Sequence, residues 1–386
     1  MINKLVLVLE KKIWKSINTE NRIGLLDGLS GTALFYNSLI ELEYKKSYFK
    51  KLTFIVNKIN RLVNEHHQGF SLCSGLAGFG WLLNTIKNKN IVIDESYFEV
   101  IDEILINELN NESNKNNYDF MHGAMGIALY LLDRCKDNNQ TSIVNVLNVF
   151  LFELNAKILN NLESIIIREK SFINEKHVFF GIAHGVAGII NFLTYIKINF
   201  KQSNVGLNEA IALCSEYVLK FKFLDSNSKQ FYPHTLYVES NIVNQAIFGW
   251  CQGDLGIACA FFNAQIILQN EVLQTEAIEL FKNSRRITFN DSGIKDFGIC
   301  HGSTGIVAQY FLLNLKFDIE CTAMINYWLD CIKDQTKNFE LFLAHQGNNN
   351  YKEDFTLLNG VTGLAMVVLT VENKIHINWL NILNLH

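Results

Sequence analysis

Seven stretches of the chain are apolar on every side, and each of them starts at a glycine. They read GTALFYNSLI, GFGWLLNTI, GIALYLL, GIINFLTYI, GIACAFFNAQIIL, GIVAQYFLLNL and GLAMVVLTV. A helix that is hydrophobic all round must be enclosed by other elements. The pattern therefore predicts seven buried helices.

Amphipathic stretches separate the apolar ones. In SYFEVIDEILINEL, Phe98, Ile101 and Leu105 recur at helical spacing. The acidic residues between them, Glu99 and Asp102, should point away from the core. We expect each such stretch to form an outer helix that is paired with a buried one.

A short motif precedes each buried helix: a glycine is followed three residues later by a second glycine. The first glycines are Gly28, Gly75, Gly123, Gly185, Gly253, Gly302 and Gly360. Successive copies lie 47 to 68 residues apart, which is room for two helices and their loops. We therefore expect an all-α fold, an α/α toroid whose inner ring of helices is shielded by an outer ring, as a single domain over residues 1–386. An open solenoid of helix pairs is the alternative.

Glycine is costly inside a helix, so the motif should lie at the turn that enters each buried helix. There it would permit positive φ and would let the chain approach its neighbours closely. Pro233 is the only proline, so little interrupts the helices. It lies in residues 225–245, for which we predict a β-hairpin or a loop, with His234 on the surface.

Composition narrows the class of protein. With 49% hydrophobic and 19% charged residues, the chain is too apolar for wholesale disorder. Its net charge is −4 and no block of like charges occurs, which excludes the electrostatic footprint of a nucleic-acid-binding protein. The eight cysteines contain no CxxC pair, and no unbroken apolar run is long enough for a membrane helix. We therefore expect a cytoplasmic location.

The residues directly before the first glycines are all polar. They are Asp27, Ser74, His122, His184, Gln252, His301 and Asn359. One position earlier, three of the seven residues are cysteines, namely Cys73, Cys251 and Cys300. Apolar helices cannot host polar groups cheaply, so we expect these positions to line a shared mouth at one end of the ring.

Cys251, Cys300 and His301 stand out among these positions. Two thiolates and one imidazole suit Zn²⁺, and three protein ligands leave a fourth position open, as in catalytic zinc sites. Alternatively, the cysteines are small buried hydrophobes and His301 is a hydrogen-bonded histidine. The spacing alone leaves both interpretations open.

Three segments together carry a resemblance to a known family. In chain order, AHGVAG, GWCQGDLG and CHGSTG resemble the signature of the lanthionine synthetase C-like family of peptide cyclases. The resemblance spans almost the whole chain, because the sevenfold repeat is also that family's α/α toroid. Gln252 departs from the pattern, since several members of the family have an aromatic residue after the cysteine.

The resemblance implies a set of site residues and a reaction. Cys251, Cys300 and His301 would bind one catalytic Zn²⁺, His184 would be the acid/base residue, and Asp119 its acidic partner. The reaction would be the addition of a peptide cysteine to dehydroalanine or dehydrobutyrine, as in lanthipeptide biosynthesis. For Asp119, capping of the third buried helix is the alternative role.

The resemblance also implies partners. Because the repeats occupy the whole chain, we expect a separate dehydratase to act on a precursor peptide with a leader, and an export transporter is a further candidate partner. The protein could then be peripheral to a membrane-associated biosynthetic complex. Two other functions are open. One is a zinc-dependent thiol alkyltransferase resembling prenyltransferases, although the zinc ligand set of that family resembles Asp, Cys and His. The other is a non-enzymatic protein that binds glutathione or a thiol peptide.

Overall fold

The computed structural model describes residues 4–43, 45–65, 69–87, 91–137, 140–168, 175–223 and 228–386. Each glycine motif is followed by an inner helix, as the sequence predicts. The inner helices are α2 (Leu29–Leu42), α4 (Leu76–Ile86), α6 (Ala124–Asp137), α9 (Val186–Asn199), α11 (Asp254–Leu268), α14 (Ser303–Phe317) and α16 (Val361–Val371).

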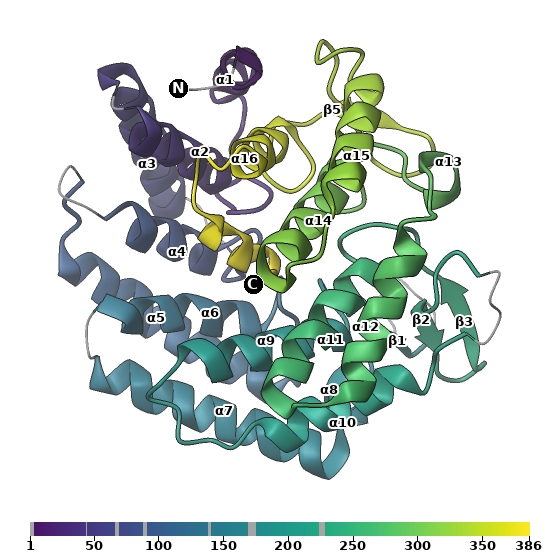
Figure 1. Cartoon of the computed structure of the whole chain (residues 1–386). Coiled ribbons are helices and arrows are strands. Elements are labelled where there is room, and N and C mark those ends of the chain that lie inside the picture. The colour runs from purple at the N-terminus through teal and green to yellow at the C-terminus, as the bar shows by residue number, and fades with distance from the viewer. Residues whose placement is uncertain are drawn as a thin grey trace.

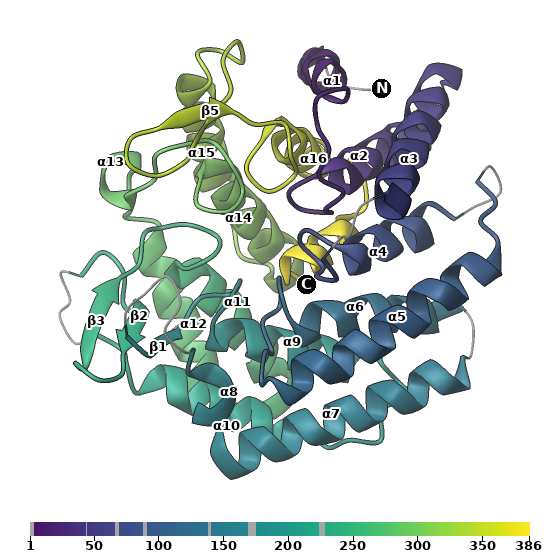
Figure 2. The ribbon, with the colours of Figure 1, turned by 180° about the vertical axis from the view of Figure 1, so that it is seen from behind.

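The inner helices close into a ring. Helix α2 packs on α4, α4 on α6, α9 on α11, α11 on α14, and α14 on α16. Helix α16, near the C-terminus, packs against α2, near the N-terminus, and both views of the ribbon show the two side by side (Figures 1 and 2). An open solenoid would leave these two helices apart, so the fold is the α/α toroid.

Amphipathic helices surround the ring. They are α1 (Lys4–Ser16), α3 (Lys46–Glu65), α5 (Glu95–Asn114), α7 (Thr141–Asn161), α10 (Asn208–Leu219), α12 (Glu271–Ser284) and α15 (Thr322–Gln335). Helix α5 buries Phe98, Ile101 and Leu105, as its periodicity predicts. The expectation for Asp102 was wrong: it is 6% exposed, because Tyr130 and the buried Arg134 of α6 both donate hydrogen bonds to its carboxylate.

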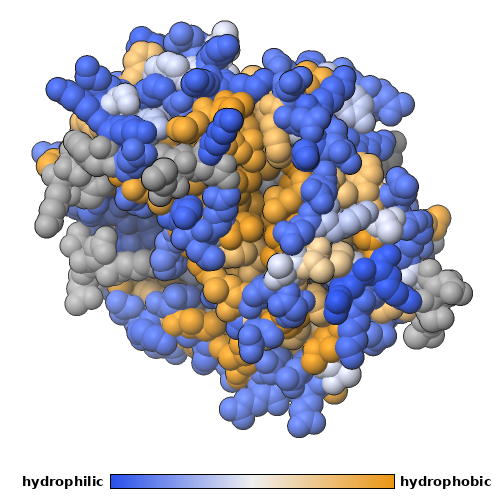
Figure 3. Space-filling model, turned by 45° about the horizontal axis from the view of Figure 1, so that its top comes forward, coloured by the Kyte–Doolittle hydropathy of each residue, from blue (hydrophilic) through white to orange (hydrophobic). Residues whose placement is uncertain are grey.

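By length and composition alone, helix α7 could cross a membrane. In the structure it packs on α6, α10 and the short α8 (Glu163–Ile166), and it buries Leu147 and Leu151. Its Phe152 is 66% exposed. Apolar residues reach the surface at other places too, and on the face in Figure 3 they form a band between hydrophilic flanks.

Two small sheets interrupt the helices. Strands β1 (His177–Phe179), β2 (Pro233–Tyr237) and β3 (Ile242–Gln245) form an antiparallel sheet in that order, with Val178 opposite Leu236 and Leu236 opposite Val243. Strands β2 and β3 are a hairpin within residues 225–245, where the sequence analysis placed a hairpin or loop. A second hairpin, β4 (Leu343–His345) and β5 (Tyr351–Glu353), precedes α16. The remaining elements are α13 (Phe289–Ser292) and the 3₁₀-helix η1 (Ile377–Leu383).

The C-terminal residues fill the middle of the ring (Figure 1). The backbone oxygen of Leu383 accepts a hydrogen bond from the indole of Trp250 at 3.0 Å. Asn384 accepts from the Asn191 side chain at 2.9 Å and donates to the Gly188 oxygen at 2.8 Å. His386, which is 6% exposed, lies among inner helices as well.

The glycine motifs serve close packing rather than positive φ. The first glycines have extended backbone angles, for example φ −113° at Gly185, and among the described glycines only Gly293 and Gly347 have positive φ. A Cβ at Gly185 would lie 2.4 Å from the oxygen of Phe179. The expectation of close approach is therefore confirmed, and that of positive φ was wrong.

Gly363→Ala should lower the free energy of unfolding. Its Cβ would lie 2.0 Å from the oxygen of Leu357 and 2.8 Å from Cδ1 of Ile299, and such overpacking costs about 1–3 kcal/mol. Gly206→Ala is the matched control, because a Cβ there meets nothing within 4 Å. Urea denaturation of the two variants measures the difference, and equal midpoints would contradict the prediction.

Candidate active site

The turns before the inner helices are hydrogen-bonded to one another through their backbones. The bonds run from the nitrogen of Leu26 to the oxygen of Cys73 (3.0 Å), Cys73 to Met121 (3.0 Å), Ala183 to Cys251 (3.5 Å), Cys251 to Cys300 (3.0 Å), Cys300 to Leu358 (3.1 Å) and Leu358 to Leu26 (2.7 Å). These residues are the column two positions before the first glycines. All seven turns therefore face one end of the toroid.

Exposure along this ring of turns picks out two residues. The seven polar residues directly before the first glycines are all at least partly exposed, as expected for a mouth. In the column one position earlier, five residues are buried, and only Cys251 and Cys300 are partly exposed. The two cysteines are thus not simply part of the apolar core.

The structure brings Cys251, Cys300 and His301 together. The two sulfur atoms and an imidazole nitrogen all lie within 4.8 Å of one another. Gly249 lies close to this cluster, and a Cβ there would make a tight contact of 3.1 Å with the Cα of His301. Among the described residues, no other group of three or more His, Cys, Asp or Glu side chains brings its ligand atoms so close.

The electrostatics of this cluster fit a cation. A hydrogen bond from the Cys300 thiol, helped by His301, lowers the pKa of Cys251 well below its usual value. The same contact raises the pKa of Cys300, and Cys251 raises that of His301. Two sulfurs and one imidazole are a ligand set that suits Zn²⁺ and leaves one coordination position for another group.

His184 lies on the next turn of the ring. The nitrogen of Ala183 donates to the oxygen of Cys251, and a Cβ at Gly181 would lie 2.1 Å from that oxygen, so the two turns are tightly packed. The Nδ1 atom of His184 lies 2.8 Å from Oδ2 of Asp119. Since Asp119 occupies Nδ1, the Nε2 atom remains for another partner.

Asp119 combines both roles that the sequence left open. Its Oδ1 accepts hydrogen bonds from the backbone nitrogens of Met121 (2.8 Å) and His122 (2.7 Å), which holds the turn before α6. Its Oδ2 binds His184 and a guanidinium nitrogen of Arg168, the latter at 2.9 Å. Capping and histidine pairing thus use different oxygens of one carboxylate.

Asp119 and His184 shift each other's protonation. Burial would raise the pKa of Asp119, but the hydrogen bond and charge of His184 and the charge of Arg168 hold it below its usual value. Burial would lower the pKa of His184, but the hydrogen bond and charge of Asp119 raise it above its usual value. The pair therefore favours a carboxylate beside an imidazolium.

Comparison with known proteins agrees with this architecture. A model of the lanthionine synthetase C-like protein family matches residues 19–384. This chain belongs to the lanthionine synthetase C-like family. The solved structure of nisin cyclase superposes with a TM-score of 0.79 at 18% identity, covering 97% of this chain and 97% of that one, which shows the shared fold.

A second solved structure is much less similar to this chain. An inactive variant of an α-1,6-mannanase of Salegentibacter sp. HEL1_6, in complex with α-1,6-mannotriose, has a TM-score of 0.46 at 11% identity, covering 96% of this chain and 98% of that one. A search of curated proteins finds no match to this sequence.

The sequence analysis missed two residues near the candidate site of this chain, Arg168 and His234. Arg168 donates to Asp119 and, at 3.2 Å, to the oxygen of His184, and it comes from the long segment between the third and fourth repeats. His234 was expected on the surface, but it is only partly exposed and stacks on Phe179 beside His184. No periodic signal marks either residue, because both lie outside the glycine motifs.

His122, the mouth residue of the third repeat, lies beside His184. Their ring centroids are 5.8 Å apart and the rings are nearly parallel, at 10°. Burial lowers the pKa of His122, and the charge of His184 lowers it further against the pull of Asp119. His122 thus lies where the sequence analysis expects a lining residue of the mouth.

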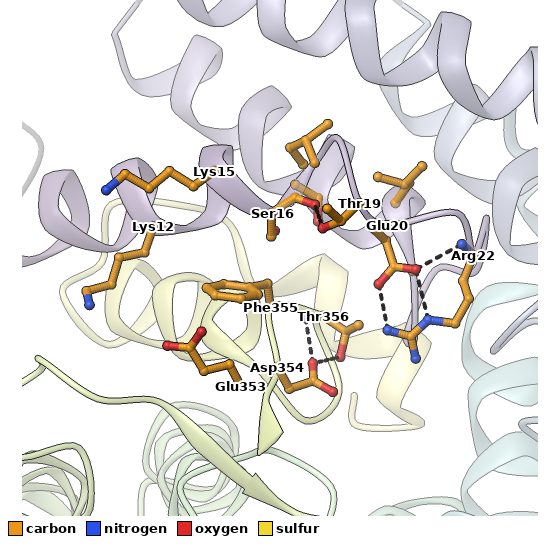
Figure 4. A pocket seen from close by; sticks show the side chains of 14 residues that line it. Lys12, Lys15, Ser16, Thr19, Glu20, Arg22, Glu353, Asp354, Phe355 and Thr356 are labelled. Carbon is orange, nitrogen blue, oxygen red and sulfur yellow. Dashed lines mark hydrogen bonds and ion pairs between the residues drawn. The ribbon is translucent and has the colours of Figure 1, made fainter. Parts of the chain in front are cut away.

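A pocket of about 570 Å³ lies to one side of the mouth, between α1, the start of α2 and the residues after β5 (Figure 4). It reaches Gly28, the neighbour of mouth residue Asp27. Three of its charged groups have partners within the chain: Arg22 pairs with Glu20, and Asp354 accepts two hydrogen bonds from Thr356. None of the predicted site residues lines it.

Asp119→Asn should lower the pKa of His184. Loss of an adjacent carboxylate removes about 1–3 pH units from the titration midpoint of a paired group. NMR titration of the His184 imidazole measures this midpoint without any assay of activity. Because the midpoint is raised in the native protein, the imidazolium is present below it and is lost as the pH rises through it, and in the variant this loss comes at lower pH.

Asp354→Asn is the matched control for that experiment. Asp354 also accepts from a backbone nitrogen in its turn, that of Thr356 at 2.8 Å, but within the described residues no histidine hydrogen-bonds to it. It should leave the His184 titration unchanged. An unshifted midpoint in Asp119→Asn would mean that the Asp119 contact does not control His184.

Proposed function

We propose that this chain is a zinc-dependent lanthionine- and methyllanthionine-forming cyclase, which adds a peptide cysteine to dehydroalanine or dehydrobutyrine in a dehydrated precursor peptide. The observation that carries the proposal is the juxtaposition, on neighbouring turns of one ring, of a two-sulfur, one-imidazole cluster and a carboxylate-held histidine. Membership of the family and the shared fold with nisin cyclase support it.

The cluster is the part of the site that would hold the metal. Cys251, Cys300 and His301 offer two sulfurs and one nitrogen within 4.8 Å of one another. When bound, zinc would lower the pKa of a substrate thiol so that it reacts as a thiolate near neutral pH. The zinc ligand set of prenyltransferases resembles Asp, Cys and His, whereas this cluster has two Cys and one His. The difference favours the cyclase over the alkyltransferase.

His184 would complete the addition. The substrate sulfur attacks the β-carbon of the dehydro residue, and the electron pair of the carbon–carbon double bond moves toward the α-carbon and its carbonyl group. The imidazolium of His184 then donates its Nε2 proton to the α-carbon, while the Nδ1 proton stays on the imidazole, hydrogen-bonded to Asp119, which remains ionised. The Asp119 carboxylate, which is itself paired with the Arg168 guanidinium, thus raises the pKa of His184 and orients its imidazole.

The mouth fits a peptide substrate, because its polar lining is continuous around one end of the ring. We propose that a separate dehydratase supplies the dehydro residues, that the precursor carries a leader, and that the reaction takes place in the cytoplasm. An export transporter would act on the product, so the protein could work at the edge of a membrane-associated complex.

The purified protein should contain one zinc per chain, and Cys251→Ala and Cys300→Ala should both lose it. Cys214→Ala is the matched control, because Cys214 is a buried residue of the outer helix α10. Elemental analysis measures the metal, and circular dichroism confirms that each variant is folded. A folded native protein that stays metal-free after incubation with zinc would contradict the proposed site.

His184→Asn should reduce ring closure by about 10²- to 10⁴-fold, the usual contribution of a general acid. The substrate is a synthetic peptide with one cysteine and one dehydroalanine. Ring closure leaves the mass unchanged, so free thiols are counted by alkylation and mass spectrometry, against a reaction without protein. The variant should retain its zinc.

His376→Asn, on the 3₁₀-helix side of the fold, is the control for that substitution. It should close rings at the native rate. Native protein that binds the thiol peptide but never closes the ring would overturn the cyclase in favour of the non-enzymatic thiol binder.

A further inference from the structure

His234 lies in the wall of the site. Its ring stacks on Phe179 at 5.2 Å between centroids, and Phe179 in turn lies 6.3 Å from the ring of His184. The backbone oxygen of His234 accepts a hydrogen bond from the nitrogen of Phe180 at 3.1 Å. Strand β1 ends at Phe179, shortly before the His184 turn, and it pairs with β2, which carries His234. The sheet therefore holds the two histidines in place relative to each other.

A second set of contacts ties His234 to the sulfur cluster. Asp254, three residues after Cys251, accepts hydrogen bonds from the backbone nitrogens of Phe231 (2.6 Å) and Tyr232 (3.1 Å). The nitrogen of Asp254 donates to the side chain of Gln230 at 2.8 Å. The residues that lead into β2 are therefore anchored to the same turn that carries Cys251.

The environments of His234 and His184 shift their pKa values in opposite directions. Within the described part of the chain no carboxylate hydrogen-bonds to His234, and its Nδ1 pairs with the hydroxyl of Thr235 at 3.0 Å. Burial lowers its pKa, and of the charged groups that act on it, Cys251 raises the pKa while His184 and His177 lower it. The environment thus favours the charged form of His184 and the neutral form of His234.

Thioether formation needs both an acid and a base. A proton must leave the sulfur of the incoming cysteine, and a proton must arrive at the α-carbon of the dehydro residue. Where environments push two titratable groups apart, they mark the base and the acid. His122 has a lowered pKa too, but His234 is the histidine whose segment is hydrogen-bonded to Asp254, on the turn that carries Cys251.

We propose that His234 is the base that accepts the thiol proton of the substrate cysteine, and this inference rests on the proposed cyclase. The sulfur–hydrogen bond breaks, the proton goes to Nε2 of His234, and the electron pair stays on sulfur. Sulfur then bonds to the β-carbon, and His184 protonates the α-carbon. One proton leaves the thiol and one reaches carbon, so water need only return a proton from His234 to His184.

The test follows thiol capture separately from ring closure. Cobalt-substituted protein changes its visible absorption when a thiol joins the site, so capture of a cysteine peptide without any dehydro residue can be timed by stopped flow. In His234→Gln, capture should slow by about 10²-fold at pH 6.5, the lower end of the range for general bases. The deficit should shrink as the pH approaches about 8.5, the ordinary pKa of a thiol, because the thiol then ionises unaided.

His376→Gln is the matched control and should capture the thiol at the native rate at every pH. A deficit in His234→Gln that is the same at all pH values would mean a structural wall residue and would overturn the proposal, as would native capture rates. Loss of cobalt by the variant would also count against it, since it would make His234 a support of the cluster.

The two proposals can fail separately. If the native protein captures thiols but closes no ring, the cyclase fails, and the pH-dependent deficit still decides whether His234 accepts the proton. If rings close and capture does not depend on His234, the cyclase stands and the base is another group.

Discussion

The backbone hydrogen bonds that link the turns at the mouth are the constraint on which the rest of the structure depends. Cys251 and Cys300 belong to different repeats, and their sulfurs meet because the nitrogen of one turn bonds to the oxygen of the next. A side chain at Gly24 or Gly181, each four residues before the first glycine of a motif, would push neighbouring turns apart, because a Cβ at Gly24 would lie 2.5 Å from the Cys73 oxygen and one at Gly181 would lie 2.1 Å from the Cys251 oxygen. The glycines therefore matter to the chemistry without touching it: they let the turns pack closely enough for side chains of separate repeats to form one site.

Within that frame, one carboxylate links structure to electrostatics. Asp119 holds its own turn with one oxygen and the imidazole of His184 with the other, and Arg168 keeps its charge from being unbalanced. A site that had to orient the histidine with a surface residue would lose that orientation to side-chain motion, whereas here the carboxylate is 5% exposed and bonded on every side. Among the described residues no carboxylate hydrogen-bonds to His234 on the sheet, and burial lowers its pKa, so the two histidines differ in character.

The periodic part of this architecture could be predicted from the sequence, and the aperiodic part could not. Seven glycine motifs at regular spacing predict inner helices, a polar mouth and a toroid, with an open solenoid as the alternative. The columns of the repeat contain Cys251, Cys300, His301 and His184, and the resemblance to the family gives these residues their expected roles. Arg168 and His234 lie in segments between repeats, and long-range backbone pairing with β1 and β2 brings them to the site. The same holds for Asp102, whose burial depends on Arg134 in another helix. Local pattern carries no record of such partners.

The C-terminal segment has a consequence for how a long peptide could be processed. Because residues after η1 occupy the middle of the ring and bond to Trp250, Asn191 and Gly188, the toroid is a cup and not a tube. A chain cannot be threaded through it from one side to the other. Under the proposed function, a peptide segment that reaches the sulfur cluster would enter and leave at the same end of the ring, so a peptide with several rings would visit the cup once for every ring.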